Sequence, residues 1–209
     1  MKFAIGIPTL NRIDLLYPSI LLYLRDFPDT HIYVLDNGNQ DTSKIKYAHV
    51  HIMKNEQNVG VGASWNMLCN VIFANHPYAL ILNDDVYLGK RTADIKELIE
   101  KKKYKGAFLR AVPDWCAFII SKSIYEKVGR FDECFMPAYY EDMSYERRMF
   151  LQGIPIIKTP SLIPYVYNSS KTLEKMPELQ EASKRNKELY VEMWGGEPSK
   201  EKFKTPFNK

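Results

Sequence analysis

The sequence predicts an α/β fold in which a mostly parallel sheet is covered by helices on both faces. Short, almost continuous apolar segments alternate along the chain with segments whose apolar residues recur every three or four positions. Strands that lack polar alternation are usually buried on both faces, as in parallel sheets. The 209 residues are 45% apolar, which suits one compact domain with a substantial core.

The first half of the chain supplies the clearest strands, each a short apolar run that ends in turn residues. We predict strands at residues 3–7, 31–36, 49–53 and 78–82, with Pro8 ending the first. Between them, apolar residues at helical spacing predict helices, with a face at Ile13, Leu16, Ile20 and Leu24, then over 63–74 and over the charged segment 92–103.

The second half is less regular. Strands are predicted at 106–110, 115–120 and 154–157, and helices at 121–128 and from about 141. After residue 170 the chain becomes rich in Lys and Glu, and a helix face is predicted at Leu179, Ala182, Asn186, Leu189 and Met193. We therefore expect one domain over 1–170 with a helical extension, 171–209, packed on it.

Charge and cysteine content exclude several classes of protein. The chain has 29 Lys and Arg against 25 Asp and Glu, a net charge of +4 that is spread out, so nucleic-acid binding is not expected. No apolar run approaches the length of a membrane helix, and the N-terminus lacks a signal-peptide core. Three widely spaced cysteines indicate neither a disulfide framework nor a zinc site, which favours the reducing cytoplasm.

Polar residues follow each of the first strands, where ligands bind in an open parallel sheet. They are Thr9, Asn11 and Arg12, then Asp36 and Asn37, then Asn58 and Gly60, and finally Asn83, Asp84 and Asp85. Asn37 and Asn39 are equally well explained as turn residues. Two adjacent carboxylates repel each other, so Asp84 and Asp85 predict a divalent cation, which commonly bridges to phosphates.

The segment 58–66, Asn-Val-Gly-Val-Gly-Ala-Ser-Trp-Asn, contains a Gly-x-Gly pair. A dinucleotide-binding fingerprint is disfavoured because its third glycine is missing and the motif lies outside the first strand–helix–strand unit. A loop that opens a helix, with Asn58 and Ser64 available to bind a ligand, fits better.

A pair of carboxylates, Glu141 and Asp142, follows the aromatic residues Tyr139 and Tyr140. Acidic residues in the first turn of a helix are also explained by the helix dipole alone. Together with Trp115, however, the aromatic rings and carboxylates could form a wall that stacks on a sugar and binds its hydroxyls.

In its order of motifs the chain resembles GT-A-fold glycosyltransferases of the family 2 type. The motifs IPTLNR (7–12), LDNG (35–38), NVGVGASWN (58–66), LNDDV (82–86) and the segment from VGRFDE to YYEDMSYERR (128–148) occur in the order and spacing of that family. The resemblance covers about residues 3–158. The segment 190–208 is more weakly similar to the ends of short bacterial and viral sugar transferases.

The resemblance implies a GT-A (Rossmann-like) fold and inverting transfer of a sugar from a nucleoside-diphosphate sugar to a glycan or glycoconjugate, with Mn²⁺ or Mg²⁺ as cofactor. A donor half, about 1–88, and an acceptor half, about 89–170, follow from it. UDP-glucose is the default donor, with dTDP- or UDP-rhamnose next.

The resemblance also implies roles for individual residues. Asp85 is the expected metal ligand, Asp142 the expected general base, and Trp115, Tyr140 and Glu141 the expected acceptor-binding residues. The expected donor-binding residues are Pro8, Thr9, Asn11, Arg12, Asp36, Asn58, Gly60, Ser64, Asn83 and Asp84, of which Thr9, Asn11, Arg12 and Asp36 would hold base and ribose.

The chain departs from the family pattern at three places. Asn83 replaces the first Asp of the metal motif, and Ser144 replaces the acidic residue often found two positions after the catalytic Asp. All four histidines precede the metal motif, and the stretch where many relatives carry a late histidine reads YVYNSSK (165–171).

Two other functions remain as alternatives. A sugar nucleotidyltransferase normally has a Gly-rich phosphate loop after its first strand, and PTLNR contains no glycine. A non-catalytic carbohydrate-binding module would use Trp115, Tyr139 and Tyr140 and would ignore nucleotide and metal.

The sequence also bears on membrane contact and on the cellular compartment. A solvated helix face explains the Lys-rich tail better than contact with anionic lipid at a membrane surface; its lysines are Lys171, Lys175, Lys184, Lys200, Lys202 and Lys204. The chain could also be part of a larger polypeptide, and for a viral protein the expected compartment is the host cytoplasm.

Overall fold

A computed structural model describes residues 2–88, 92–100, 106–111, 115–159, 166–167 and 178–209. Its main sheet has the strand order β3-β2-β1-β4-β7-β6-β8. The strands are β1 (Phe3–Thr9), β2 (Ile32–Asp36), β3 (Val50–Lys54), β4 (Tyr78–Leu82), β6 (Phe108–Arg110), β7 (Ala117–Ser121) and β8 (Ile156–Lys158). A separate antiparallel pair joins β5 (Val86–Tyr87) to β9 (Val166–Tyr167).

The sheet is parallel where the site forms. β1 pairs in parallel with both β2 and β4, and β2 pairs in parallel with β3. β7 runs antiparallel to β4 and to β6, so the sheet is mixed on its far side. The predicted α/β sheet flanked by helices is confirmed, and the ends of β1, β2 and β4 meet along one edge.

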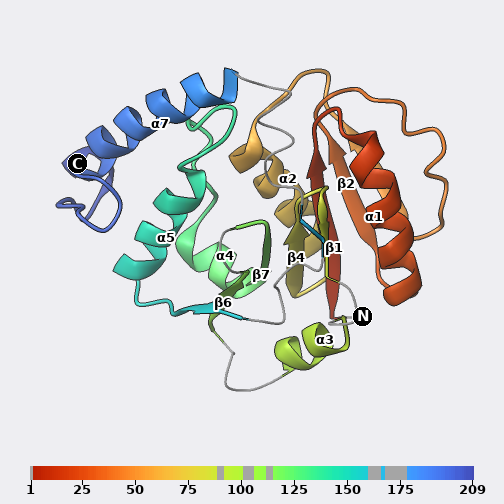
Figure 1. The fold of residues 1–209 in the computed structure, drawn as a ribbon. Coiled ribbons are helices and arrows are strands. Elements are labelled where there is room, and N and C mark those ends of the chain that lie inside the picture. The colour runs from red at the N-terminus through yellow and green to blue at the C-terminus, as the bar shows by residue number, and fades with distance from the viewer. Residues whose placement is uncertain (1, 89–91, 101–105, 112–114, 160–165, 168–177) are drawn as a thin grey trace.

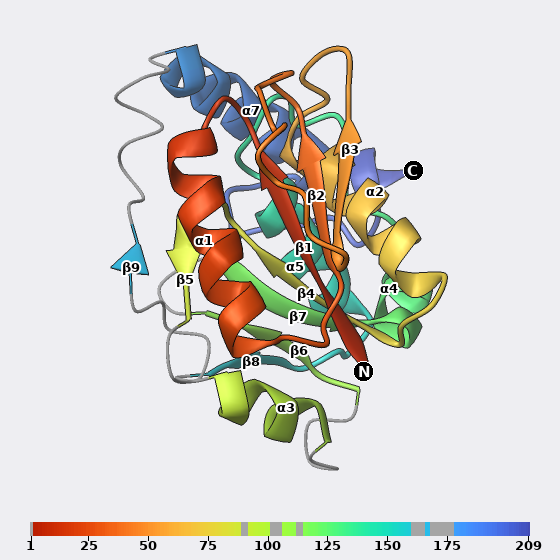
Figure 2. The same cartoon turned by 90° about the vertical axis from the view of Figure 1, so that its right-hand side faces the viewer.

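Helices cover both faces of the sheet, as Figures 1 and 2 show. Alternate residues of β1 explain the two layers, because Phe3, Ile5 and Ile7 pack into one cluster and Ala4 into the other. The first cluster contains residues of α1 (Ile13–Asp26) and α3 (Thr92–Glu100), and the second contains residues of α2 (Val61–Phe73), α4 (Lys122–Val128) and α5 (Glu141–Leu151).

The C-terminal helix α7 (Glu178–Trp194) crosses beside α5 and the loop before it (Figure 1). It is anchored by a third, small cluster of buried residues, Phe135, Tyr190, Met193 and Trp194. After it the chain ends in a short 3₁₀ turn, η4 (Pro206–Asn208). The predicted start of the extension, Lys171 and Lys175 lie outside the described residues.

Element boundaries differ from the predicted ones by a few residues. β1 continues through Pro8 to Thr9, because the β1–β2 pairing extends to Thr9 and Asp36. α2 starts at Val61, directly after Gly60, whose φ of 82° lies in the left-handed region. In the part of the chain that the structure describes, no helix is both long and apolar enough to cross a membrane.

Candidate active site

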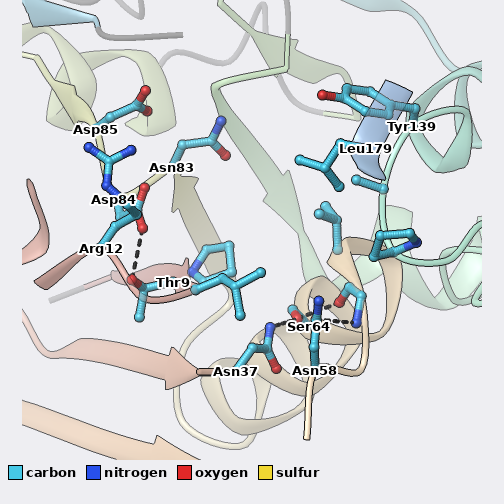
Figure 3. A pocket seen from close by; sticks show the side chains of 16 residues that line it. Thr9, Arg12, Asn37, Asn58, Ser64, Asn83, Asp84, Asp85, Tyr139 and Leu179 are labelled. Atoms are coloured by element: carbon cyan, nitrogen blue, oxygen red, sulfur yellow. Dashed lines mark hydrogen bonds between the residues drawn. The ribbon is translucent and has the colours of Figure 1, made fainter. Parts of the chain in front are cut away.

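A cavity of about 260 Å³ opens at the carboxyl ends of β1 and β4 (Figure 3). One wall comes from the residues after these strands, and the other comes from the start of α2, the loop before α5 and the first turn of α7. The lining residues are Pro8, Thr9, Leu10, Arg12, Asn37, Asn58, Gly60, Val61, Ser64, Asn83, Asp84, Asp85, Pro137, Ala138, Tyr139 and Leu179.

Asp84 and Asp85 form the acidic wall of this cavity, and a hydrogen bond from the end of β1 to the turn after β4 holds it in place. Thr9 Oγ1 donates a 2.8 Å hydrogen bond to Asp84 Oδ2. Burial raises the pKa of Asp84 to about 7, and the neighbouring Asp85 carboxylate adds to this shift while the hydrogen bond from Thr9 opposes it. Asp85 is also buried, at 8% exposure. The two carboxylates therefore form a site that favours a cation.

Arg12 lies beside these two carboxylates. It is 4% exposed and makes a two-pronged contact with Asp14, at 3.0 and 3.2 Å. That hydrogen bond raises the pKa of Arg12, and the charges of Asp84 and Asp85 raise it further. In Figure 3 the guanidinium lies beside both carboxylates. Arg12 thus brings a positive charge to the acidic side of the cavity.

The opposite wall is built from the loop that opens α2. Asn37 Nδ2 donates to Ser64 Oγ at 2.7 Å, and Ser64 Oγ donates to the Gly60 carbonyl at 2.5 Å. Asn58 Oδ1 accepts from the Gly60 N–H at 2.9 Å. A Cβ on Gly62 would lie 2.8 Å from the Asp132 carbonyl oxygen. These bonds and this close packing explain the two glycines without a dinucleotide fingerprint.

Asp36 and Asn11 stand outside the cavity lining. Asp36 is fully buried; one carboxylate oxygen accepts from the Gly38 N–H at 2.9 Å, and the other has no hydrogen-bond partner among the described residues. Lys54 Nζ lies 4.0 Å from that second oxygen. Asn11 has a φ of 54° and packs against Gly38, where a Cβ would collide with Asn11 Oδ1. Asn11 thereby shapes the turn after β2.

The second pair of carboxylates opens α5. Glu141 is buried, its Oε2 atom has no partner among the residues described, and burial raises its pKa well above the usual range, with the Asp142 charge adding to the shift. Burial also raises the pKa of Asp142 to about 6, opposed by the Met143 N–H, which donates to Asp142 Oδ1 at 2.8 Å. Asp142 is therefore ionised at neutral pH, and Glu141 holds its proton more tightly than an ordinary glutamate does.

Trp115 does not form the expected sugar-stacking wall. It is 5% exposed and packs among Trp65, Phe108 and Phe118 in the core. Its indole N–H donates to Glu146 at 2.8 Å. The error has a physical reason, since a Trp beside a strand satisfies burial more often than it binds a ligand. Tyr140 is half-buried and lies against Tyr190 of α7.

Several lining residues carry no signal in the sequence that marks them as part of a site. Pro137, Ala138, Leu10 and Val61 have no distinctive side-chain chemistry. Leu179 is predicted as part of an apolar helix face, but nothing in the pattern indicates that this helix reaches the cavity. Tyr139 is predicted only as part of an aromatic wall, and it lines the cavity instead.

The acidic wall fits a divalent cation whose remaining coordination positions are filled by substrate phosphates. Among the residues that the structure describes, no group of three or more His, Cys, Asp and Glu side chains is arranged to hold a metal ion. Mg²⁺ and its analogues, however, are commonly held by one or two carboxylates together with substrate phosphates. Asp84 and Asp85 meet that requirement, and the burial and mutual repulsion that raise the pKa of Asp84 are what a bound cation would offset.

Comparison with known protein families identifies the family of this chain. The model of the family described as "Glycosyl transferase family 2" matches residues 4–112, which contain β2, β3, β4, all of β1 except Phe3, and both Asp84 and Asp85. The chain belongs to glycosyl transferase family 2. The predicted family is thereby confirmed.

Solved structures similar to this glycosyltransferase 2 chain share its fold at low identity. The mannosyltransferase PcManGT from Pyrobaculum calidifontis, in complex with GDP-Man and Mn²⁺, has a TM-score of 0.63 and 11% identity, over 78% of this chain and 56% of that one. The glucosyl-3-phosphoglycerate synthase from Mycobacterium tuberculosis, with Mn²⁺, UDP and phosphoglyceric acid, has a TM-score of 0.62 and 14% identity, over 88% and 75%. The chain thus spans just over half of the first structure's length. No curated protein matches the chain.

Proposed function

We propose that this chain transfers a sugar from a nucleoside-diphosphate sugar to a hydroxyl of a glycan or glycoconjugate, with inversion at the anomeric carbon. One observation carries the proposal. A cavity of about 260 Å³ has the Asp84–Asp85 pair on one wall, and its other wall includes Pro137, Ala138 and Tyr139 of the loop that leads to Asp142, which does not itself line the cavity. The proposal therefore places a charged leaving group against Asp84 and Asp85 and takes the base for the incoming hydroxyl from the segment that follows the opposite wall.

The diphosphate is proposed to lie against Asp85 and Arg12. Asp85 would hold Mn²⁺ or Mg²⁺, with Asp84 oriented behind it by Thr9. When bound, that ion supplies charge neutralisation for the departing nucleoside diphosphate. The 4% exposed Arg12 guanidinium, fixed by Asp14, adds a preorganised positive charge at the same end. The Mn²⁺ in the solved structures of the mannosyltransferase and of the phosphoglycerate synthase supports this assignment.

The nucleoside is proposed to bind at the ends of β1 and β2. Asp36 is fully buried and lies outside the cavity lining, so the proposal requires the turn after β2 to open; Asp36 Oδ2, which has no hydrogen-bond partner among the described residues and lies 4.0 Å from Lys54 Nζ, could then accept an N–H of the base. Uracil and thymine each present one such N–H, so a UDP-sugar such as UDP-glucose is the first candidate, and a dTDP- or UDP-rhamnose the next. Guanine also presents N–H groups, and GDP-mannose therefore belongs in the same test.

Asp142 is the proposed general base. Its pKa of about 6 leaves it ionised at neutral pH yet more basic than an ordinary aspartate. It would accept the proton of the acceptor hydroxyl as that oxygen bonds to the anomeric carbon. The bond from this carbon to the diphosphate breaks with its electron pair going to the leaving nucleoside diphosphate. Attack opposite the leaving group inverts the anomeric configuration.

The burial of Trp115 weighs against the carbohydrate-binding module. That alternative depended on exposed aromatic faces at Trp115, Tyr139 and Tyr140, and the faces of Trp115 are covered by other core rings. Family membership weighs against the nucleotidyltransferase in the same way.

The proposal is tested by incubating the purified chain with UDP-glucose, UDP-rhamnose, dTDP-rhamnose and GDP-mannose plus Mn²⁺. Release of nucleoside diphosphate is followed with and without a panel of glycan acceptors. We expect one donor to be consumed, faster with an acceptor, and the product linkage seen by NMR to be inverted. No consumption of any nucleotide sugar, or a retained linkage, would overturn the proposal.

A further inference from the structure

The C-terminal helix α7 contacts the loop that precedes Glu141 and Asp142 through one buried amide, that of Asn186. Asn186 is 1% exposed, and its Nδ2 lies 2.8 Å from the Ala138 carbonyl oxygen, 3.2 Å from that of Tyr139 and 3.3 Å from that of Met136. Arg185, on the exposed side of the same helix, donates to the Met136 carbonyl at 2.7 Å. The Asn186 amide thus donates to three carbonyl groups of a single loop.

That loop needs outside support because its backbone is strained. Tyr139 and Tyr140 have φ values of 77° and 78°, two successive residues with side chains in the left-handed region. Such conformations persist only where surrounding contacts over-determine them. Tyr140 precedes the first residue of α5 and makes no side-chain cap bond. On its inner side the loop is held by the Val61 N–H, which donates to the Pro137 carbonyl at 2.9 Å.

The strained residues set the direction of α5 and hence of its first two side chains. Glu141 and Asp142 follow Tyr140 without an intervening residue, so a rotation at Tyr139 or Tyr140 would move both carboxylates. The charged groups that act on Asp142 are Glu146 on the same helix and Arg110 of β6, and the charge of Asp142 in turn raises the pKa of the adjacent Glu141.

A second bond ties the far end of α7 to the same turn of α5. Trp194 Nε1 donates to Ser144 Oγ at 3.0 Å, and Ser144 Oγ donates to Asp132 at 2.5 Å. Arg148 lies 3.2 Å from the same Asp132 carboxylate. Ser144 stands at the position where relatives often carry an acidic residue, and here it accepts a hydrogen bond from α7. The negative charge that pairs with Arg148 comes from Asp132 instead.

We propose that Asn186 is a positioning residue for Asp142, acting through the Met136–Tyr140 loop. The inference rests on the proposed function, because it gives Asp142 the role of base. It adds a part of the chain that lies beyond the family match, which ends at residue 112. Asn186 touches neither donor nor base; it fixes the backbone from which Asp142 is presented.

The test compares Asn186→Ala and the isosteric Asn186→Asp, which removes the amide donors, with Glu188→Ala on the exposed face of the same helix. We expect both Asn186 variants to lower kcat about 10–100-fold and to change donor affinity less than about threefold, because positioning acts on the chemical step. Glu188→Ala should match the parent protein. Arg185→Ala, an exposed position that bonds the same loop, should lower kcat by about threefold and keeps the test decisive if the Asn186 variants fold poorly.

A second readout separates this inference from the proposed function. The Asp142 carboxyl is titrated by ¹³C NMR in the parent protein and in each variant. Loosening the loop should change the surroundings of the Asp142 carboxyl, including its 2.8 Å bond from the Met143 N–H, and thereby shift its pKa away from about 6. Absent activity in all proteins with a shifted titration would contradict the function and keep the positioning role. An unchanged Asp142 titration and kcat in folded variants would overturn the inference.

Discussion

Thr9 Oγ1 and Asp84 Oδ2, 75 residues apart in sequence, are joined by a 2.8 Å hydrogen bond. The bond links the end of β1 to the turn after β4, the two strands that pair in parallel at the centre of the sheet. Thr9 Oγ1 in turn accepts from Gln40 Nε2 at 3.1 Å. The orientation of Asp84 thus depends on the end of β1 and on the loop after β2.

Replacing Thr9 by valine tests this link, since valine keeps the shape and removes the hydroxyl. We expect donor affinity in the presence of Mn²⁺ to fall about fivefold to tenfold, the effect of one lost hydrogen bond of about 1–1.5 kcal/mol. Calorimetric titration measures it, and Thr205→Val, at an exposed position, is the control. Unchanged donor affinity in Thr9→Val would show that Asp84 is positioned by something else.

Asp142→Asn removes the proposed base while keeping its size. We expect kcat to fall about 10²–10⁴-fold, the usual contribution of general base catalysis, with donor binding retained. Asp29→Asn, on an exposed loop, serves as the matched control. Steady-state kinetics and donor titration on the same preparations make the comparison, and a normal kcat in Asp142→Asn would exclude Asp142 as the base.

The pH profile of kcat provides a second readout of the same residue. Because Asp142 must be deprotonated to accept a proton, kcat should rise as the pH rises through about 6 and then level off. The limb should be absent from the residual activity of Asp142→Asn. A profile that falls with rising pH in this range would assign an acid, not a base, to the limiting step.

Trp115 is predicted to matter for stability. Its ring packs against Trp65 and Phe108, and its N–H donates to Glu146. We expect Trp115→Ala to lower the free energy of unfolding by about 3–5 kcal/mol, as for other buried aromatic residues. Phe150→Ala, at a ring that is 72% exposed, should change it by less than about 0.5 kcal/mol. Urea unfolding measures both. A Trp115→Ala protein of normal stability that lost acceptor binding would restore the sugar-wall hypothesis.

The chain's four histidines lie together, away from the cavity. His31 Nδ1 is 2.8 Å from His51 Nε2, and the rings of His49 and His76 lie 5.1 and 5.9 Å from that of His31. Burial, followed by the charges of the other three, lowers the pKa of His31. The unfolded chain therefore binds this proton first on acidification, so stability is lost as the pH falls below the unfolded pKa of about 6.5.

His31→Asn isolates this effect. Between pH of about 7.5 and 5.5, the parent protein should lose more unfolding free energy than the variant. The raised pKa values of Asp84, Glu141 and Asp142 act in the opposite sense, since acidification relieves their buried charge. They are common to both proteins and cancel in the difference. Equal pH dependence in urea unfolding would contradict the prediction.

The features that the sequence predicts best are those that depend on local pattern. The apolar run 78–82 forms β4 with the same limits, and the polar residues after it line the cavity. A continuous apolar run marks a buried parallel strand, and the residues at the carboxyl ends of neighbouring parallel strands lie at the same edge of the sheet. The pattern alone therefore predicts that Asp84 and Asp85 lie near Thr9. The antiparallel pairing of β7 has no such signal, because a fully buried strand reads the same in either direction.

The features that escape prediction depend on long-range packing. The burial of Trp115 and the turn of Arg12 toward Asp84 follow from neighbours far away in sequence. So does the placement of α7 over the Met136–Tyr140 loop. A signal does exist for Asn186, a polar residue on an otherwise apolar helix face, because a buried amide must find hydrogen-bond partners. Nothing local indicates that these partners are the carbonyls before the base.

Calorimetric titration of the nucleotide-sugar panel with Mn²⁺, repeated with EDTA and with Asp85→Ala, tests the central claim most directly. We predict that one nucleotide sugar binds, that EDTA weakens the binding at least about tenfold, and that Asp85→Ala does the same, because the ion and its carboxylate ligand act on one diphosphate. Binding that is equally tight with EDTA and with Asp85→Ala would contradict a metal-assisted donor site at the end of β4.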